Sequence, residues 1–248
     1  MLLGYNTNGL AHHELFAAIA ILEEIGYRSV AITIDHMALS PFASYGEQRL
    51  ARLRRVLKAS DMRSVIETGA RFLLDPRQKH EPTLLTSDPQ ARRRRIEFYR
   101  YAINCAAELG SDCVSLWSGV LRDPLPHDAA IDRLAEGLQE LLDYAASRQV
   151  VIGFEPEPGM LIDSMRAYED LLRRIDAPNL RLTLDVGHLQ CQGEVPIADV
   201  ICRWGPRLVN VHLDDMRAGV HVELSRHSHE GPDVARRAME FLRRCLKN

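Results

Sequence analysis

The sequence predicts an α/β fold, a (β/α)8 TIM barrel that takes up residues 1–248 as a single domain. Short β-branched apolar runs alternate with segments of helical periodicity through most of the chain, which is typical of a parallel sheet covered by helices. A length of 248 residues is normal for such a barrel. The alternative, an open doubly wound sheet, would favour a glycine-rich phosphate turn after the first strand, and YNTNGLAHH is not such a turn.

The first half of the chain supplies four candidate strands. They are expected at 2–7, 29–35, 63–70 and 113–119, with helices at 12–26, 49–60 and 91–110. Gly26 is a C-cap signal for the first helix, and Asp88-Pro89 is an N-cap and first-turn pair for the third. The segment 71–90 shows no clear periodicity, and connections of that length often serve as lids or binding loops.

The second half of the chain continues the alternation as far as the seventh strand. Strands are expected at 150–158, 180–188 and 208–215, and helices at 129–149, 164–176 and 195–205. Ser164 or Asp163 is the cap of the helix at 164–176. The eighth strand is expected at 220–225 and the last helix at 232–246. The pattern therefore offers eight strands, but the last connection differs from the others.

The connection between strands seven and eight is too short for a parallel crossover. Only the six residues DDMRAG separate Leu213 from Val220, whereas a crossover needs a dozen residues or more. The crossover helix between these strands is therefore missing. Either strand eight forms an antiparallel hairpin with Gly219 in its turn, or the last strand and helix are exchanged within a homodimer, or an internal segment has been lost. In the hairpin, His221 would lie opposite His212, with Glu223 further down the barrel.

Composition restricts the classes of partner and location. Apolar residues make up 46% and charged residues 26% of the chain, as in a globular protein with a core. The net charge of −3 gives no general attraction for nucleic acid or an anionic membrane. No basic, apolar leader and no apolar run of spanning length is present. The cysteines form no CxxC pair, which favours reduced thiols in a cytoplasmic protein; they are Cys105, Cys113, Cys191, Cys202 and Cys245.

Four polar side chains end the last four predicted strands, namely Glu155, Asp185, His212 and Glu223. In a parallel barrel the carboxyl ends of the strands meet at one face, where active sites lie. Carboxylates with an imidazole suit Mn²⁺, Mg²⁺, Co²⁺ or Zn²⁺, and the lack of cysteine ligands argues against a closed structural zinc site. Helix capping or a salt bridge is the alternative role for any one of these residues.

These strand ends resemble those of the xylose isomerase-like TIM barrels, a family that includes sugar isomerases and epimerases and the type IV apurinic endonucleases. The resemblance lies in FEP at 154–156, LDVGH at 184–188, VHLDD-x-R at 211–217 and VHVELS at 220–225. It implies that Glu155, Asp185, His212 and Glu223 are metal ligands, and that His188 and Arg217 bind hydroxyl or carbonyl oxygens of a substrate. The family has a full crossover after the strand-seven motif, and this departure bears most on Glu223.

The activity implied by the resemblance is a metal-dependent isomerisation or epimerisation of a sugar or sugar phosphate. The metal would polarise a ketose carbonyl and favour an enediolate. Glu155 and Glu223, on opposite sides of the substrate, would remove and return the proton as the catalytic pair. Glu157 is expected to be a partner of the ligand residues rather than a catalytic group.

Other strand-end residues are candidates for binding the substrate. They are Asn6, His36, Glu67 and Trp117. The structural alternative is capping for His36 with its neighbour Asp35, an ion pair with Arg71 for Glu67, and core packing for Trp117.

Two other functions are compatible with the barrel. An endonuclease-like phosphodiesterase would need two or three metals, with more early-strand histidines than His36 and an Asp-x-His after strand seven, which is absent. A non-catalytic barrel, impaired by the missing crossover, would bind or assemble without turnover.

Overall fold

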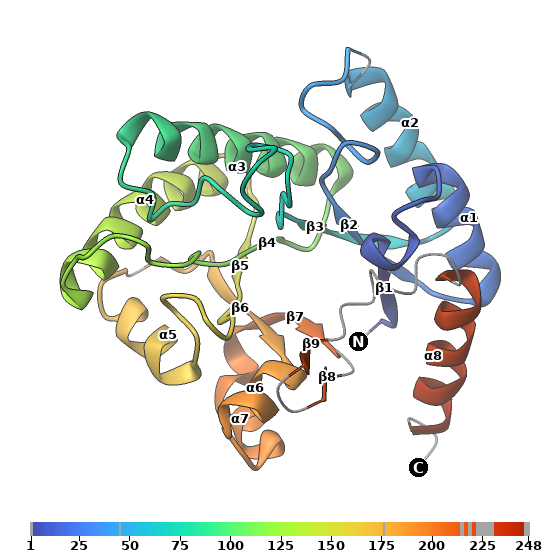
Figure 1. Cartoon of the computed structure of the whole chain (residues 1–248). Helices are drawn as coiled ribbons and strands as arrows, with labels where there is room; N and C mark the ends of the chain where they lie inside the picture. Colours follow the sequence, from blue (N-terminus) through green and yellow to red (C-terminus); the bar gives the residue numbers. More distant parts are fainter. Residues whose placement is uncertain are drawn as a thin grey trace.

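The computed structural model of the chain contains a curved sheet of seven parallel strands (Figure 1). It describes residues 2–44, 46–175, 177–213, 216–217, 220–221 and 231–245. The strands pair in chain order, each parallel to the next. They are β1 (Gly4–Asn6), β2 (Ser29–Thr33), β3 (Arg63–Glu67), β4 (Val114–Leu116), β5 (Ile152–Phe154), β6 (Leu180–Asp185) and β7 (Leu208–His212). This is the strand order of a TIM barrel.

Helices cover the outer side of the sheet, as Figure 1 shows. The α-helices are α1 (Leu15–Ile25), α2 (Gly46–Ala59), α3 (Pro89–Leu109), α4 (His127–Ser147), α5 (Met165–Leu172), α6 (Val186–Gln192), α7 (Ile197–Trp204) and α8 (Gly231–Cys245). Two 3₁₀ turns are η1 (Thr7–Leu10) and η2 (Gly205–Arg207). No helix among the described residues has both the length and the apolar character that a membrane span requires.

Helix ends follow the capping signals in the sequence. Gly26 ends α1 with φ 104°, a left-handed conformation that glycine adopts without a Cβ clash. Asp88 caps α3 by accepting hydrogen bonds from the backbone N–H groups of Gln90 and Ala91. Ser164, rather than Asp163, caps α5. These local predictions are therefore confirmed.

Strand alternation separates the apolar core from the barrel interior. On β6, Leu182 and Leu184 are buried on the face that meets the helices, while Thr183 and Asp185 lie on the opposite face. The Phe154 ring of β5 stacks on Tyr168 of α5 with 5.8 Å between ring centroids. Such packing fixes each strand against its helix, so that the strand ends hold defined positions.

The long segment between β3 and α3 is anchored to the core. Arg95 of α3 is fully buried, and its guanidinium donates hydrogen bonds to the backbone oxygens of Pro82 (2.5 Å), Thr68 (3.3 Å) and His80. Leu84 and Leu85 of the same segment are buried as well. The sequence indicated a segment of the length that often serves as a lid or binding loop, and in the structure Arg95 anchors its backbone to α3.

After β7 the chain forms a short antiparallel pair. Strand β8 (Met216–Arg217) pairs with β9 (Val220–His221), with Met216 opposite His221. No eighth strand joins the parallel sheet within the described ranges. The hairpin anticipated from the sequence paired His221 with His212, and that register is wrong because β9 pairs with β8 instead of β7. Of the expected strand at 220–225, residues 222–225 lie outside the described part of the chain.

The last helix returns to the start of the chain. In Figure 1, α8 lies beside α1, and the Tyr27 hydroxyl donates a hydrogen bond of 3.0 Å to the backbone oxygen of Ala235. Ala235 and Met239 are buried in the same core as Leu22 of α1. Helix α8 thus takes the place next to α1 that the last helix of a closed barrel occupies.

Candidate metal centre

Three of the predicted ligands meet at the carboxyl ends of adjacent strands. Glu155 directly follows β5, Asp185 ends β6 and His212 ends β7. Asp185 and His212 are register partners across the β6–β7 pair, so their side chains project on the same face. Each of the three residues offers one ligand atom, and these atoms all lie within 4.8 Å of one another. Parallel pairing therefore produces the convergence that the sequence predicted.

The His212 ring lies between two carboxylates. Its Nδ1 is 2.9 Å from Glu155 Oε1, and its Nε2 is 3.1 Å from Glu67 Oε1. Asn210, two residues earlier on the same face of β7, donates through Nδ2 to Glu67 Oε1 at 3.4 Å. Both ring nitrogens of His212 are thus engaged by acidic side chains.

The charges of these groups are strongly interdependent. Burial alone lowers the pKa of His212, but Glu155 and Glu67 raise it well above its ordinary value. Burial raises the pKa of Glu155, and His212 with His188 more than offsets this, so that the pKa lies below its usual range. Burial and the nearby Glu155 raise the pKa of Asp185 to about 6. The cluster therefore holds more acidic groups than its single histidine can neutralise.

This donor set fits a divalent cation. Buried carboxylate oxygens with one imidazole nitrogen are ligands that suit Mg²⁺, Mn²⁺, Co²⁺ and Zn²⁺. A cation would replace the protons that His212 and Asp185 retain, because metal ligands bind in their deprotonated forms. Glu155, Asp185 and His212 could hold the ion.

His188 and Glu157 form a second group that shares Glu155. His188 Nδ1 lies 3.1 Å from the backbone oxygen of Pro156, which can only accept, so Nδ1 carries a hydrogen. Its Nε2 lies 3.7 Å from Glu157 Oε2 and 3.8 Å from Asp185 Oδ2. The backbone N–H of His188 also donates to Asp185 Oδ1 at 3.0 Å, which caps α6. The predicted substrate residue His188 is therefore adjacent to the ligand cluster.

The remaining predicted substrate residues lie in different settings. Asn6 accepts hydrogen bonds from the Asn8 backbone N–H and the Thr33 hydroxyl, so its carbonyl oxygen holds the turn after β1. Trp117 is buried, with the His80 ring at its edge and the Arg95 guanidinium over its face. His36 is exposed. None of these three hydrogen-bonds a member of the cluster in the described structure.

Two predicted residues belong to the last part of the chain. Glu223, expected as a metal ligand and catalytic group, lies outside the described residues. The backbone of Arg217 belongs to β8, and its side chain is likewise outside the description.

Glu67 makes contacts that the sequence did not suggest. The sequence marks Glu67 as a strand-end candidate for binding substrate, and in the structure its carboxylate contacts His212 and Asn210 across the barrel interior. Asn210 lies two residues before His212 on β7, so the two side chains face the same side of the sheet. That spacing is the sequence signal that could have identified Asn210 as a neighbour of the cluster. The contact between β3 and β7 cannot be read from spacing along the chain.

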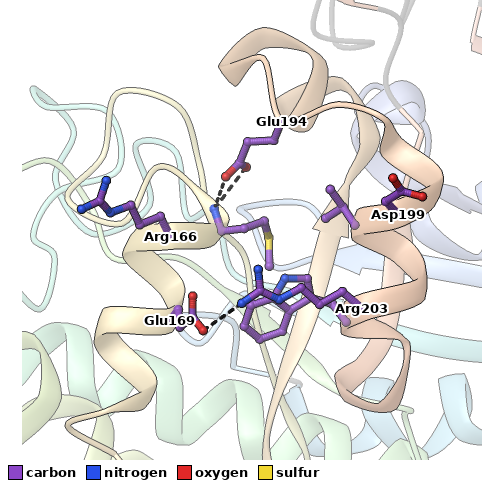
Figure 2. Close-up of a pocket in the computed structure, with 8 residues that line it drawn as sticks. Arg166, Glu169, Glu194, Asp199 and Arg203 are labelled. Carbon is purple, nitrogen blue, oxygen red and sulfur yellow. Dashed lines mark hydrogen bonds and ion pairs between the residues drawn. The ribbon is translucent and has the colours of Figure 1, made fainter.

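A separate groove lies on the flank of the barrel between α5 and α7 (Figure 2). It has a volume of about 490 Å³ and includes Met165, Val200 and Trp204. Glu194 accepts a hydrogen bond from the Met165 backbone N–H at 3.0 Å, and Arg203 pairs with Glu169 at 2.9 Å. The groove contains none of the strand-end ligands, so its size does not make it the reactive centre.

The chain is similar to known proteins over most of its length. A family model described as "Xylose isomerase-like TIM barrel" matches residues 19–245. The L-ribulose-5-phosphate 3-epimerase of Salmonella heidelberg (strain SL476) is 24% identical over 205 residues, covering 82% of this chain and 69% of that protein. The inosose dehydratase of Clostridium beijerinckii (strain ATCC 51743 / NCIMB 8052) is 32% identical over 87 residues, covering 35% and 29% of the two chains.

A similar solved structure extends the likeness to the whole chain. The crystal structure of a D-tagatose 3-epimerase-like protein superposes with a TM-score of 0.77 at 18% identity. The superposition covers 100% of this chain and 97% of the other. At this identity the likeness establishes the fold, a TIM-barrel-like α/β architecture.

Proposed function

Because the chain belongs to the xylose isomerase-like TIM barrel family, we propose that it is a divalent-metal-dependent isomerase or epimerase of a small sugar or sugar phosphate. The observation that carries the proposal is the convergence of Glu155, Asp185 and His212, with one ligand atom of each within 4.8 Å of the others. The names of the relatives, an L-ribulose-5-phosphate 3-epimerase and an epimerase-like barrel, support this reaction class.

A divalent cation held by Glu155, Asp185 and His212 would polarise a substrate carbonyl and its neighbouring hydroxyl, which makes the adjacent C–H bond more acidic. Glu155 is the group that would take up that proton. The neighbouring histidines keep its pKa below the usual range, so its carboxylate is ionised at neutral pH and can act as a general base.

His188 is proposed to orient the substrate. The Nδ1–H contact with Pro156 O fixes the ring, so that Nε2 points towards Asp185 and Glu157. In that position Nε2 can accept a hydrogen bond from a hydroxyl group of a bound sugar. Arg217, two residues after the LDD of the strand-seven motif, is proposed to bind a second substrate oxygen.

The fourth ligand and second catalytic group is proposed to be Glu223. Support comes from the motif VHVELS, which resembles the last strand of the family. We also propose that the chain lacks the usual crossover helix between strands seven and eight. Support comes from the antiparallel pairing of Met216–Arg217, which lie within the six-residue connection DDMRAG, with Val220–His221, since a parallel crossover needs a dozen residues or more. A homodimer in which a partner supplies the last strand is the alternative way to place Glu223.

A dehydratase is the second candidate function. The local match to an inosose dehydratase favours it, and elimination of water next to a carbonyl begins with the same proton removal by Glu155. The two reactions differ in what leaves: an epimerase returns a proton to the carbon, and a dehydratase releases hydroxide as water. The products therefore separate the two functions.

Metal titration followed by product analysis tests the proposal. The metal-free protein should bind Mn²⁺, and the loaded protein should convert one member of a panel of ketoses and ketose phosphates to its epimer or aldose, detected by NMR. Glu155→Gln should lower turnover by about 10²- to 10⁴-fold. Glu169→Gln, in the flank groove, is the matched control and should leave turnover unchanged. Failure to bind Mn²⁺ would contradict the proposal.

A further inference from the structure

Glu67 occupies an unusual position for a carboxylate. It ends β3 and keeps only 7% of its surface exposed. Its Oε1 lies 3.1 Å from His212 Nε2 and accepts from Asn210 Nδ2 at 3.4 Å. Both of these groups belong to β7, which is four strands away in the sheet. The Glu67 side chain therefore crosses the barrel interior and contacts Nε2 of His212, the ring nitrogen that does not face Glu155.

The contacts of His212 distinguish its two ring nitrogens. Nε2 lies 3.1 Å from Glu67 Oε1 and 3.0 Å from Asn210 Nδ2, whereas Nδ1 faces Oε1 of the candidate ligand Glu155 at 2.9 Å. A carboxylate oxygen can accept a hydrogen bond from each ring nitrogen in the metal-free protein. A cation held beside Glu155 would take the place of the hydrogen on Nδ1, while Nε2–H would keep Glu67 as its acceptor. Histidines that bind metals usually donate their other ring N–H to a carboxylate or a carbonyl, which sets both the tautomer and the ring orientation.

We propose that Glu67 is a positioning residue, which holds His212 through Nε2–H so that Nδ1 is the nitrogen presented to a divalent cation. The inference rests on the proposed function and deepens it, since it assigns the role of a residue outside the ligand set. Asn210 supports the same arrangement by donating to the same oxygen.

A purely structural role is the competing explanation. Because Glu67 connects β3 with β7, it could simply brace the curved sheet. A brace would affect the stability of the protein but would not determine which nitrogen of His212 binds a cation. Metal affinity and the NMR signals of the ring therefore distinguish the two roles.

The experiment compares Zn²⁺ binding and histidine NMR in the full-length chain. Glu67→Met removes the acceptor at similar volume, and Glu67→Gln keeps an acceptor oxygen without the charge. Glu81→Gln is the matched control, because Glu81 is also buried but pairs with Arg122 and Thr86. Zn²⁺ is diamagnetic, so it does not broaden the NMR signals of its ligands. Zn²⁺ affinity from calorimetry and ¹⁵N-resolved spectra of the histidine rings can therefore be obtained for the same metal.

We expect Glu67→Met to weaken Zn²⁺ binding by about 10- to 100-fold, the range found for such partners of metal ligands. Glu67→Gln should weaken it less, and Glu81→Gln should not change it. In the zinc-loaded parent protein, His212 should show a protonated Nε2 and a metal-bound Nδ1. The Nε2 proton signal should move upfield in Glu67→Gln, because an amide is a weaker acceptor than a carboxylate.

Three results would overturn the inference. If Glu67→Met binds Zn²⁺ like the parent, with the same His212 spectrum, Glu67 has no positioning role while the proposed function stands. If Glu67→Met does not fold, Glu67→Gln decides: an Nε2 proton signal of His212 unchanged from that of the parent would likewise show that Glu67 has no positioning role. If the parent protein binds no Zn²⁺, the proposed function fails together with the role of Glu67.

Discussion

At the scale of single residues, the convergence of three candidate ligands could be predicted, but their charge states could not. Glu155, Asp185 and His212 each end an apolar run, and parallel pairing brings such ends together. The proton balance depends instead on distances across the barrel. Glu67 is the clearest case, because its contact with His212 joins residues 145 positions apart in the chain. Local pattern carries no information about such a contact.

Metal binding should release protons, in an amount that depends on pH. The pKa of His212 is raised well above its ordinary value, so the metal-free protein holds that proton at pH 7. The pKa of Asp185 is raised to about 6, so a second proton is retained as the pH falls below 6. We expect release of about one proton per Mn²⁺ at pH 7 and a greater release near pH 5, with affinity falling as the pH falls.

Calorimetry in buffers of different ionisation enthalpy measures this proton release directly. Asp185→Asn should abolish the additional release near pH 5, because the amide does not titrate. Affinity that is constant between pH 5 and pH 7 would contradict the charge balance described for the cluster.

Any side chain larger than that of Gly153 should destabilise the protein, because β5 lies close to its neighbours in the barrel interior. A Cβ at this position would lie 2.5 Å from Thr183 Oγ1 and 3.2 Å from Val209 Cγ1. We expect Gly153→Ala to cost about 1–3 kcal/mol of unfolding free energy through overpacking, measured by urea denaturation. Gly46→Ala is the control, since nothing lies within 4 Å of its Cβ position. Equal stability of the two variants would show that the interior can relax.

At the scale of elements, capped helices were predictable and two other segments were not. Gly26 and Asp88 mark helix ends by local chemistry alone. Helix α6 was missed because Val186–His188 continues the apolar run of β6, while Asp185 serves both as a strand-end ligand candidate and as the helix cap. The segment 71–88 lacks periodicity, and its backbone is held instead by hydrogen bonds from the Arg95 side chain of α3 to Pro82 and His80.

Arg95 should be essential for the order of this segment. Arg95→Met would leave the backbone oxygens of Pro82, Thr68 and His80 without their donors in a buried setting. We expect a loss of about 2–4 kcal/mol, from several unsatisfied buried acceptors, and faster proteolysis between residues 71 and 88. Arg94→Met changes an exposed neighbour on the same helix and should have little effect. Unchanged proteolysis of Arg95→Met would show that the segment is held by other contacts.

At the scale of the whole molecule, the barrel architecture followed from the alternation of strands and helices, but its closure did not. Of the eight strands predicted, seven pair in parallel and in chain order in the described part of the chain, and α8 lies beside α1. For the connection after β7 we propose a departure from the repeating unit, because the six residues between Leu213 and Val220 are fewer than a parallel crossover needs. The apolar pattern does not specify the register of the antiparallel pair that follows β7.

The identity of the fourth ligand depends on how the chain closes. If Glu223 completes the centre, Glu223→Gln should weaken Mn²⁺ binding and reduce turnover about as much as Glu155→Gln does, roughly 10²- to 10⁴-fold. His221→Gln should then have little effect on either quantity. The opposite pattern, with His221 required and Glu223 dispensable, would show that a hairpin places His221 near the metal.

Hydrogen exchange with solvent is the most direct test of the central claim that Glu155, Asp185 and His212 form a proton-transferring metal centre. The Mn²⁺-loaded protein is incubated in D₂O with ketoses and ketose phosphates, and deuterium at the carbon next to the carbonyl is measured by mass spectrometry and NMR. We expect incorporation into at least one substrate, dependent on the metal and lost in Glu155→Gln. Bound metal without any incorporation across the panel would contradict the claim and favour a barrel that binds without turnover.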